Sequence, residues 1–311
     1  MDKLVEREDA PLANTLTTTT PALAVQFFLV PLAVVAVVAM IYGGFRLMVV
    51  DQRTPEEYLN DIRIGGRERR WPAAFELSRM LADPEVEGQY PMLGGALVQA
   101  FAESEGDDPR VRRYLALALG RLESAPTEAT ESLVEALDDP DSETRITVIW
   151  ALASLGDAAV VPKLAELYRS DDPGVRKMAV YALGSLDGET QLKTLRTALA
   201  DPVPDVQWNA ATALARRGDR KSVTVLRRML DRRYVEKAVT RTPSNETGLD
   251  PVGEVMISGL EAVASLKEIT VHEEVLELSR KDENLRVRQA ALEALEQIGN
   301  TSCETNVSMH R

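Results

Sequence analysis

The stretch DDPGVRKMAVYALGSL, residues 171–186, contains the pattern that decides the fold. Its apolar and small residues recur at i, i+4, i+7, i+8 and i+11, which is the stripe of an amphipathic helix. The Asp-Pro pair near its start is typical of a helix N-terminus, where Asp caps the helix and Pro occupies the first turn. The stretch therefore predicts a helix that buries one face and begins near Pro173.

The same pattern recurs along most of the chain at intervals of 31 to 49 residues. We take the second residue of each ALxxL-like block as position zero, the anchor, and number other positions from it. The anchors are Leu77, Leu119, Leu152, Leu183, Leu214, Val263 and Leu295. In the last six blocks alanine occupies position −1, which predicts a close approach between neighbouring helices. A shorter amphipathic segment precedes each block, so the period predicts stacked helix pairs.

These blocks resemble HEAT repeats, in particular the short-period repeats of phycobilisome-lyase-like proteins. The resemblance covers about residues 54–299 and implies an all-α, right-handed α-solenoid of about seven HEAT-like helical hairpins with an interaction role. Two parts depart from the pattern: the block around Trp71, as expected of a terminal cap, and the interval before Val263, which is about 17 residues longer. The resemblance also implies that Arg112, Arg176 and Arg288 form a structural ladder with the upstream aspartates.

Residues 21–50 form an apolar run, and no charged residue occurs between Ala10 and Phe45. About 20 apolar residues cross a bilayer, so we expect a single transmembrane helix after a short polar tail, residues 1–20. The acidic N-terminus and the length of the run argue against a cleaved signal peptide. Six basic residues follow the run and two precede it: Arg46, Arg53, Arg63, Arg67, Arg69 and Arg70, against Lys3 and Arg7.

This asymmetry in basic residues predicts the orientation of the chain in the membrane. We expect the N-terminus outside and the solenoid, residues 51–300, on the cytoplasmic side of a bacterial inner membrane. Residues 301–311 are expected to be a flexible C-terminal tail.

Composition excludes several classes of function. The net charge is −13, of which −12 lies in residues 71–311, and such an acidic domain repels nucleic acid. The single cysteine, Cys303, permits no disulfide within the chain. The two histidines, His272 and His310, have no companions that suggest a metal site or a catalytic triad. We therefore expect no metal, no cofactor and no enzymatic activity.

The predicted second helix of each pair has a face opposite its core stripe, at positions −9, −6, −5 and −2. In HEAT proteins this helix lines the concave surface. The face is aromatic or apolar in the first five units and acidic in the last two. One hypothesis is a docking groove for a partner segment; the alternative, equally weighted, is packing between adjacent second helices. The residues concerned are Trp71, Phe75, Tyr114, Leu117, Ile146, Trp150, Met178, Tyr181 and Trp208.

The long interval contains an insertion, residues 232–249, which we expect to be a loop. It is basic within an acidic domain, and insertions in solenoids often carry binding sites. Contact with a partner's acidic surface or with anionic headgroups is one interpretation, and a solvated loop of no special role is the other. The basic residues are Arg232, Arg233, Lys237 and Arg241.

The sequence thus favours a membrane-anchored HEAT-repeat scaffold, an accessory or assembly subunit of an inner-membrane complex. Its expected partners are membrane proteins, reached through the concave groove and the transmembrane helix, and the lipid bilayer. Two alternatives stay open: a chromophore-lyase-like modification helper and a membrane-tethered regulator.

Overall fold

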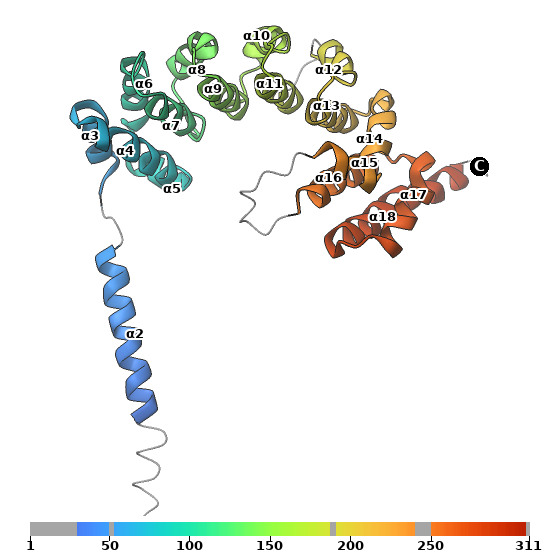
Figure 1. The fold of residues 1–311 in the computed structure, drawn as a ribbon, viewed down its shortest axis with the longest axis horizontal. Helices are drawn as coiled ribbons and strands as arrows, with labels where there is room; N and C mark the ends of the chain where they lie inside the picture. Colours follow the sequence, from blue (N-terminus) through green and yellow to red (C-terminus); the bar gives the residue numbers. More distant parts are fainter. Residues whose placement is uncertain (1–29, 50–52, 187–190, 240–249, 309–311) are drawn as a thin grey trace, which may run out of the picture. The chain divides into compact units, whose positions relative to one another are not determined.

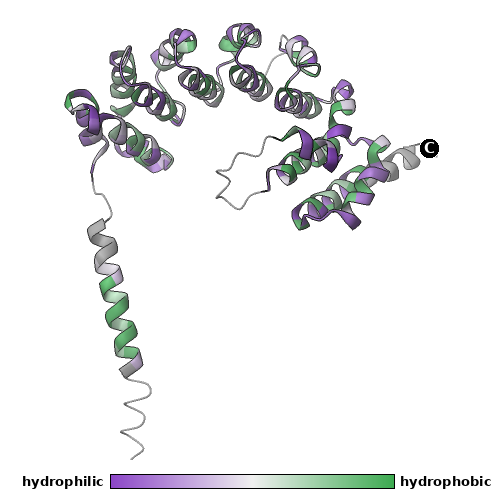
Figure 2. Cartoon of the chain, in the orientation of Figure 1, coloured by the Kyte–Doolittle hydropathy of each residue, from purple (hydrophilic) through white to green (hydrophobic). Residues whose placement is uncertain are grey.

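The computed structural model describes residues 30–49, 53–186, 191–239 and 250–308. The chain divides into two units, Met1–Arg53 and Thr54–Arg311. The described part of the first unit is one helix, α2 (Val30–Val49), which is predominantly hydrophobic (Figure 2). Among the described residues, no helix combines the length and the hydropathy that crossing a bilayer requires. Part of the predicted transmembrane span, residues 21–29 and 50, lies outside the described residues.

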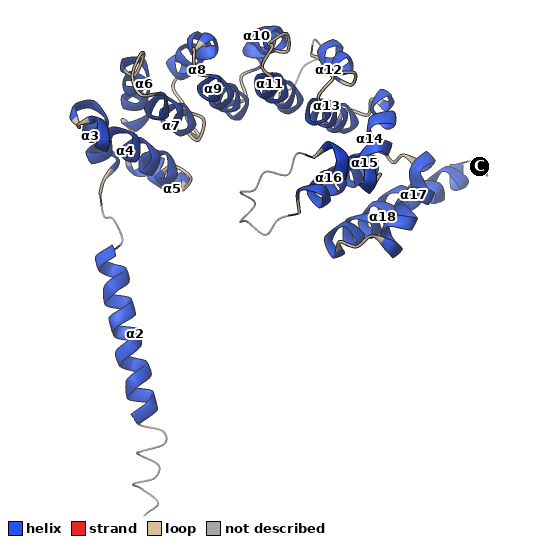
Figure 3. Ribbon diagram, in the orientation of Figure 1, coloured by secondary structure: helices blue, strands red, loops and turns tan. Residues whose placement is uncertain are grey.

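The second unit consists of two layers of helices, and Figure 3 shows that short loops join them. The first helices of the pairs are α3 (Pro55–Ile64), α6 (Leu93–Glu103), α8 (Thr127–Glu135), α10 (Val161–Leu167), α12 (Leu192–Ala198), α14 (Val223–Met229) and α17 (His272–Lys281). The second helices are α4 (Arg67–Met80), α7 (Pro109–Leu119), α9 (Ser142–Leu155), α11 (Pro173–Ser185), α13 (Pro204–Arg216), α16 (Pro251–Ser265) and α18 (Leu285–Ser308).

These seven pairs follow one another as a curved row, and the second helices lie on its inner side (Figure 1). Each second helix contains one of the seven anchors predicted from the sequence. The all-α repeat solenoid is therefore confirmed, while its right-handed sense stays a prediction. Short additional helices lie between consecutive pairs: α5 (Pro84–Gln89) and the 3-10 turns η3 (Ala158–Val160), η4 (Arg220–Ser222) and η5 (Ile269–Val271). Two more lie within pairs, the 3-10 turn η2 (Ala136–Asp138) between α8 and α9, and α15 (Arg232–Ala238) between α14 and α16.

Two boundaries differ from those expected. The insertion begins with the helix α15 rather than with a loop, and residues 240–249 lie outside the described part of the chain. The last helix, α18, continues to Ser308, past residue 300, where the sequence predicts the end of the solenoid.

The Asp-Pro pairs start the second helices in two different ways. Asp108, Asp172 and Asp250 cap α7, α11 and α16 directly, with Pro in the first turn, as predicted. Asp139 and Asp201 do not cap the N-terminus of a second helix. The helices after them start later, α9 with Asp141 as its cap and α13 after Val203. This difference leaves the carboxylates of Asp139 and Asp201 available for other partners.

The core follows the repeat. Six of the seven anchors are fully buried, and the alanines at position −1 are at most 4% exposed. Their small size is needed because a neighbouring helix lies against them. A Cβ atom added to Gly120 would lie 2.7 Å from the Cβ of Ala151, and one added to Gly184 would lie 2.7 Å from the Cβ of Ala213. Glycine at +1 of one second helix therefore contacts alanine at −1 of the next.

Candidate functional site

A ladder of ion pairs connects neighbouring repeats. Arg112 Nε donates to Asp139 Oδ2 at 2.7 Å. Arg176 donates to both carboxylate oxygens of Asp201, from Nε at 3.0 Å and from Nη2 at 3.2 Å. In each case the arginine lies on one second helix and the aspartate lies in the turn before the next one. The two aspartates are those that do not cap the N-terminus of a second helix.

Two further rungs of the ladder were not predicted from the sequence. Arg70 pairs with Asp107, and Arg145 Nη2 lies 4.0 Å from Asp172 Oδ2. Both arginines occupy position −7, the same position as Arg112 and Arg176. The recurrence of arginine at this position could therefore have predicted these two pairs. Arg288 also occupies this position, but its guanidinium pairs with no side chain in the described part of the chain.

The electrostatics of Asp201 indicate a structural role. Burial raises the pKa of its carboxyl, but hydrogen bonds from Arg176 and from the Val203 N–H outweigh this effect and hold the pKa below its ordinary value. The hydrogen bond to Asp201 in turn raises the pKa of Arg176. The pair is therefore fully charged at neutral pH. Its contribution to stability is present above the ordinary aspartate pKa and is lost as the pH falls through the lowered one.

The nine residues of the predicted inner face are not equivalent in the structure. Trp208 is 6% exposed and belongs to the core between α13 and α16. Phe75 and Tyr181 are 39% and 45% exposed. The remaining six are half-buried: Trp71, Tyr114, Leu117, Ile146, Trp150 and Met178.

Some of the half-buried side chains pack between adjacent second helices. A Cβ atom on Gly120 would lie 2.9 Å from Cζ3 of Trp150, so the indole covers the neighbouring helix at that point. A Cβ atom on Gly174 would likewise lie 2.9 Å from Cδ1 of Ile146. Packing between repeats therefore accounts for part of this face, and Phe75 and Tyr181 supply its most exposed part.

An aromatic cluster lies at the N-terminal end of the inner face. The rings of Phe75 and Tyr114 meet edge to face with centroids 5.2 Å apart. The guanidinium of Arg110 lies 4.7 Å from the centroid of the Trp71 ring. Arg110 also hydrogen-bonds to Asp108, which lowers the pKa of that carboxyl to about 2. The cluster thus forms an aromatic surface, in which the Arg110–Asp108 pair holds the guanidinium beside the Trp71 ring.

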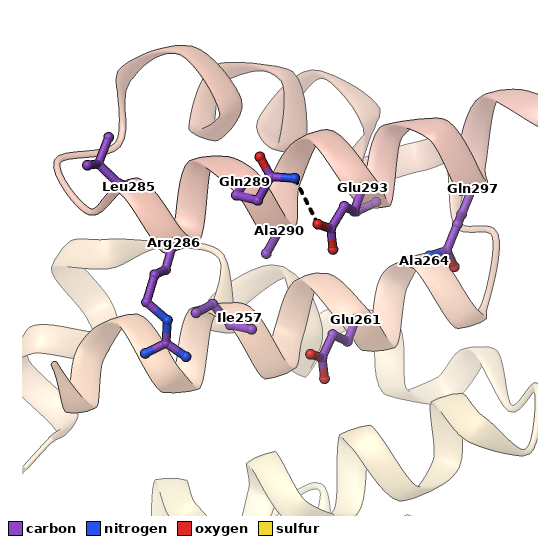
Figure 4. A pocket seen from close by; sticks show the side chains of 10 residues that line it. Ile257, Glu261, Ala264, Leu285, Arg286, Gln289, Ala290, Glu293 and Gln297 are labelled. Carbon is purple, nitrogen blue, oxygen red and sulfur yellow. Dashed lines mark hydrogen bonds between the residues drawn. The ribbon is translucent and has the colours of Figure 1, made fainter. Parts of the chain in front are cut away.

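A groove of about 370 Å³ lies at the other end, between α16 and α18 (Figure 4). Ile257 and Ala290 supply apolar surface, and Glu261 and Glu293 project from the two facing helices. The side-chain amide of Gln289 donates to Glu293 Oε1 at 2.8 Å. The acidic character predicted for the last two units is therefore present in this groove.

The basic residues of the insertion differ in their surroundings: one packs inside the fold, and two lie exposed on its surface. Arg232 is held inside the fold: its Nη2 lies 2.6 Å from Asp282 Oδ1, and its Nη1 lies 3.1 Å from Glu283 Oε1. We therefore correct its placement from the insertion's contact surface to the packing between α15 and the turn before α18. Arg233 and Lys237 are exposed. Arg241 lies outside the described residues.

The described part of the chain contains no group of three or more His, Cys, Asp or Glu side chains arranged to hold a metal ion.

The ladder predicts a difference between two adjacent basic residues. Arg176→Ala leaves Asp201, whose side chain is 3% exposed, as a buried unpaired charge and should lower the free energy of unfolding by about 3 kcal/mol. Lys177→Ala removes an exposed pair with Asp205 and should lower it by less than about 1 kcal/mol. Urea unfolding followed by circular dichroism measures both values. Equal losses for the two variants would contradict the ladder.

Comparison with known proteins agrees with this architecture. Residues 96–175 and 161–242 match the sequence model of HEAT repeats. No curated protein matches the chain.

Three solved structures illustrate the similarity. The complex of CpcE and CpcF of phycocyanin lyase from Nostoc sp. PCC7120 is 17% identical with a TM-score of 0.52, over 80% of this chain and 96% of that one. An engineered protein is 22% identical with a TM-score of 0.42, over 79% and 96%. A designed armadillo repeat protein in complex with the peptide (KR)4 is 18% identical with a TM-score of 0.41, over 79% and 100%. Identities this low relate the folds alone. The match over residues 96–242 identifies HEAT repeats in this part of the chain, and the stacked helix pairs agree with it.

Proposed function

We propose that this chain is a protein-interaction scaffold whose inner face binds a segment of a partner protein. The observation that carries the proposal is the exposure of Phe75 and Tyr181, at 39% and 45%. Both occupy position −2, which points away from the core stripe and need not be apolar for the solenoid to fold. Leu117 and Trp150 occupy the same position in the two repeats between them. Large apolar side chains thus line four successive repeats on the side away from the core.

The half-buried state of this row suits binding. Aromatic side chains that are already packed on one side lose little conformational entropy when a partner covers the other. Tyr and Trp are also the residues that most often dominate interface energetics. The inner face therefore combines rigid anchors with accessible area, and a partner segment that lies along the row can contact several of them.

We further propose that residues 21–50 anchor the solenoid in a bacterial inner membrane, with the N-terminus outside and the repeats in the cytoplasm. Support comes from the run without charge between residues 10 and 45 and from the apolar side chains of α2, among them Leu32, Met40 and Ile41, which are 64 to 67% exposed. Tethering raises the effective concentration of the inner face toward other membrane proteins. The chain then acts as an accessory or assembly subunit, in contact with membrane proteins and lipid.

The similarity in fold to the CpcE–CpcF complex of phycocyanin lyase keeps a chromophore-lyase-like role as the second candidate. We place it below the scaffold because a 17% likeness relates the folds alone. A spectral titration with a bilin separates the two: a lyase-like protein shifts the bilin spectrum, and a scaffold leaves it unchanged.

The docking proposal predicts opposite effects for two aromatic residues of the inner face. Tyr181→Glu should leave the thermal unfolding midpoint within a few degrees of wild type but reduce the partner recovered by affinity purification in mild detergent at least tenfold. Trp208→Glu buries a charge in the core and should unfold the protein. Ile269→Glu, a change at a residue 54% exposed outside the inner face, is the matched control and should retain the partner. A folded Tyr181→Glu variant that retains its partner would contradict docking on this face.

The anchor proposal predicts that the full chain stays in the membrane pellet after carbonate extraction. Deletion of residues 21–50 should move the solenoid to the supernatant. In right-side-out vesicles, protease should leave the repeats intact until detergent is added. A full chain that extracts into carbonate, or repeats cleaved before detergent is added, would contradict the proposed topology.

A further inference from the structure

Position −3 distinguishes the last repeat from all the others. In the first six second helices this residue is completely buried, at 0% exposure, whereas Leu292 in α18 is 49% exposed. The six buried residues are Ala74, Ala116, Ile149, Val180, Ala211 and Leu260. A large leucine thus lies exposed in α18 at a position that is otherwise interior.

The geometry of the stack explains the difference. The contacts of Gly120 with Ala151 and of Gly184 with Ala213 show that position +1 faces the following repeat. Position −3 lies only about 40° from +1 around the helix, so it faces the same way. In α18 this side is where a following repeat would pack, and no described helix covers it (Figure 1).

Other residues on this side of α18 are also less covered than at the same positions of earlier repeats, or lack a described partner. Leu295 is the only anchor that is not fully buried. Arg288 occupies the rung position of the ladder, and its guanidinium has no partner within the described part of the chain. Glu296, one turn after Leu292, is exposed and likewise has no described partner. Gly299 is exposed, and a Cβ atom there would meet nothing within 4 Å. We call this side of α18, with residues 285, 288, 292, 295, 296 and 299, the terminal face.

The N-terminal end of the solenoid, at α4, differs from the terminal face in the residues that it exposes. The positions of α4 that would face a preceding repeat, −8 and −1, are Arg69 and Glu76. Glu76 pairs with Arg79 at 2.8 Å, so this end presents charged residues, as the outer side of a capping repeat does. Head-to-tail stacking of two copies would bury these charges against leucine. This end is therefore a poor partner for the terminal face.

We propose that the terminal face binds the terminal face of a second copy of this chain, with the two α18 helices antiparallel around a twofold axis at Leu292. Residues equally distant from Leu292 then lie opposite one another. Arg288, four residues before it, meets Glu296 of the second copy, four residues after it, and the symmetry forms this ion pair twice. Leu285, which is 70% exposed and also borders the groove between α16 and α18, meets Gly299 of the second copy. The face is thus complementary to itself in charge and in size, as an isologous interface requires.

Charge reversal tests this interface without disturbing the core. In sedimentation of the full chain in mild detergent, wild type should be a dimer. Arg288→Glu and Glu296→Arg should each raise the dimer dissociation constant about tenfold or more, because each creates two like-charge contacts. The double variant should restore the wild-type value. Arg280→Glu changes the charge by the same amount at an exposed residue of α17 and should have no effect.

A cysteine at the symmetry axis provides a second test. In a Cys303→Ser background, Leu292→Cys should form an intermolecular disulfide on mild oxidation, and Ser258→Cys, exposed on α16, should not. Monomeric wild type at tens of micromolar, a dimer unaffected by Arg288→Glu, or failure of the double variant to recover would each overturn the proposal. A dimer that persists in both single variants assigns dimerisation to another part of the chain, such as residues 21–50, and overturns it as well.

Discussion

The close approach of neighbouring second helices is the constraint on which the rest of the structure depends. Gly184 has no room for a Cβ atom beside Ala213, and Gly120 has none beside Ala151. Such contacts bring consecutive helix backbones together, so the residues at positions −3 and zero become fully buried. Because each repeat contacts chiefly the next, stability is a sum of local interfaces rather than the property of a single core.

The residues that stabilise the stack and the residues available for binding lie on different sides of each second helix. The side toward the first helix and the neighbouring repeats carries the buried columns and the ladder of Arg112, Arg145 and Arg176. The side away from the core carries aromatic residues in the first repeats and glutamates in the last. Because the ladder and the small-residue contacts maintain the stack, a side chain such as Tyr181 is free to serve binding. This separation allows a solenoid to vary its inner face while it keeps its fold.

The sequence predicted the features that depend on local pattern and failed on those that depend on the arrangement of neighbouring pairs. The anchors, the alanine column and three helix starts follow from spacing, and the bridging role of Arg112 and Arg176 was implied by the resemblance to HEAT repeats. Trp208 and Tyr181 lie on the same predicted face, yet one is buried, because α14 and the insertion change what lies beside α13. The hydrogen-bond partners of Arg232 are 50 and 51 residues away in the sequence, and the repeat spacing does not predict such contacts.

Native-state hydrogen exchange of Ala213→Leu tests the central claim most directly. The larger side chain cannot fit against Gly184 and should destabilise this interface by about 1–3 kcal/mol. Amides in α11 and α13 should exchange about tenfold or more faster, while those in α4 and α7 keep their wild-type rates. A uniform increase throughout residues 54–308 would show a single cooperative unit and would contradict a stack held by local contacts between repeats.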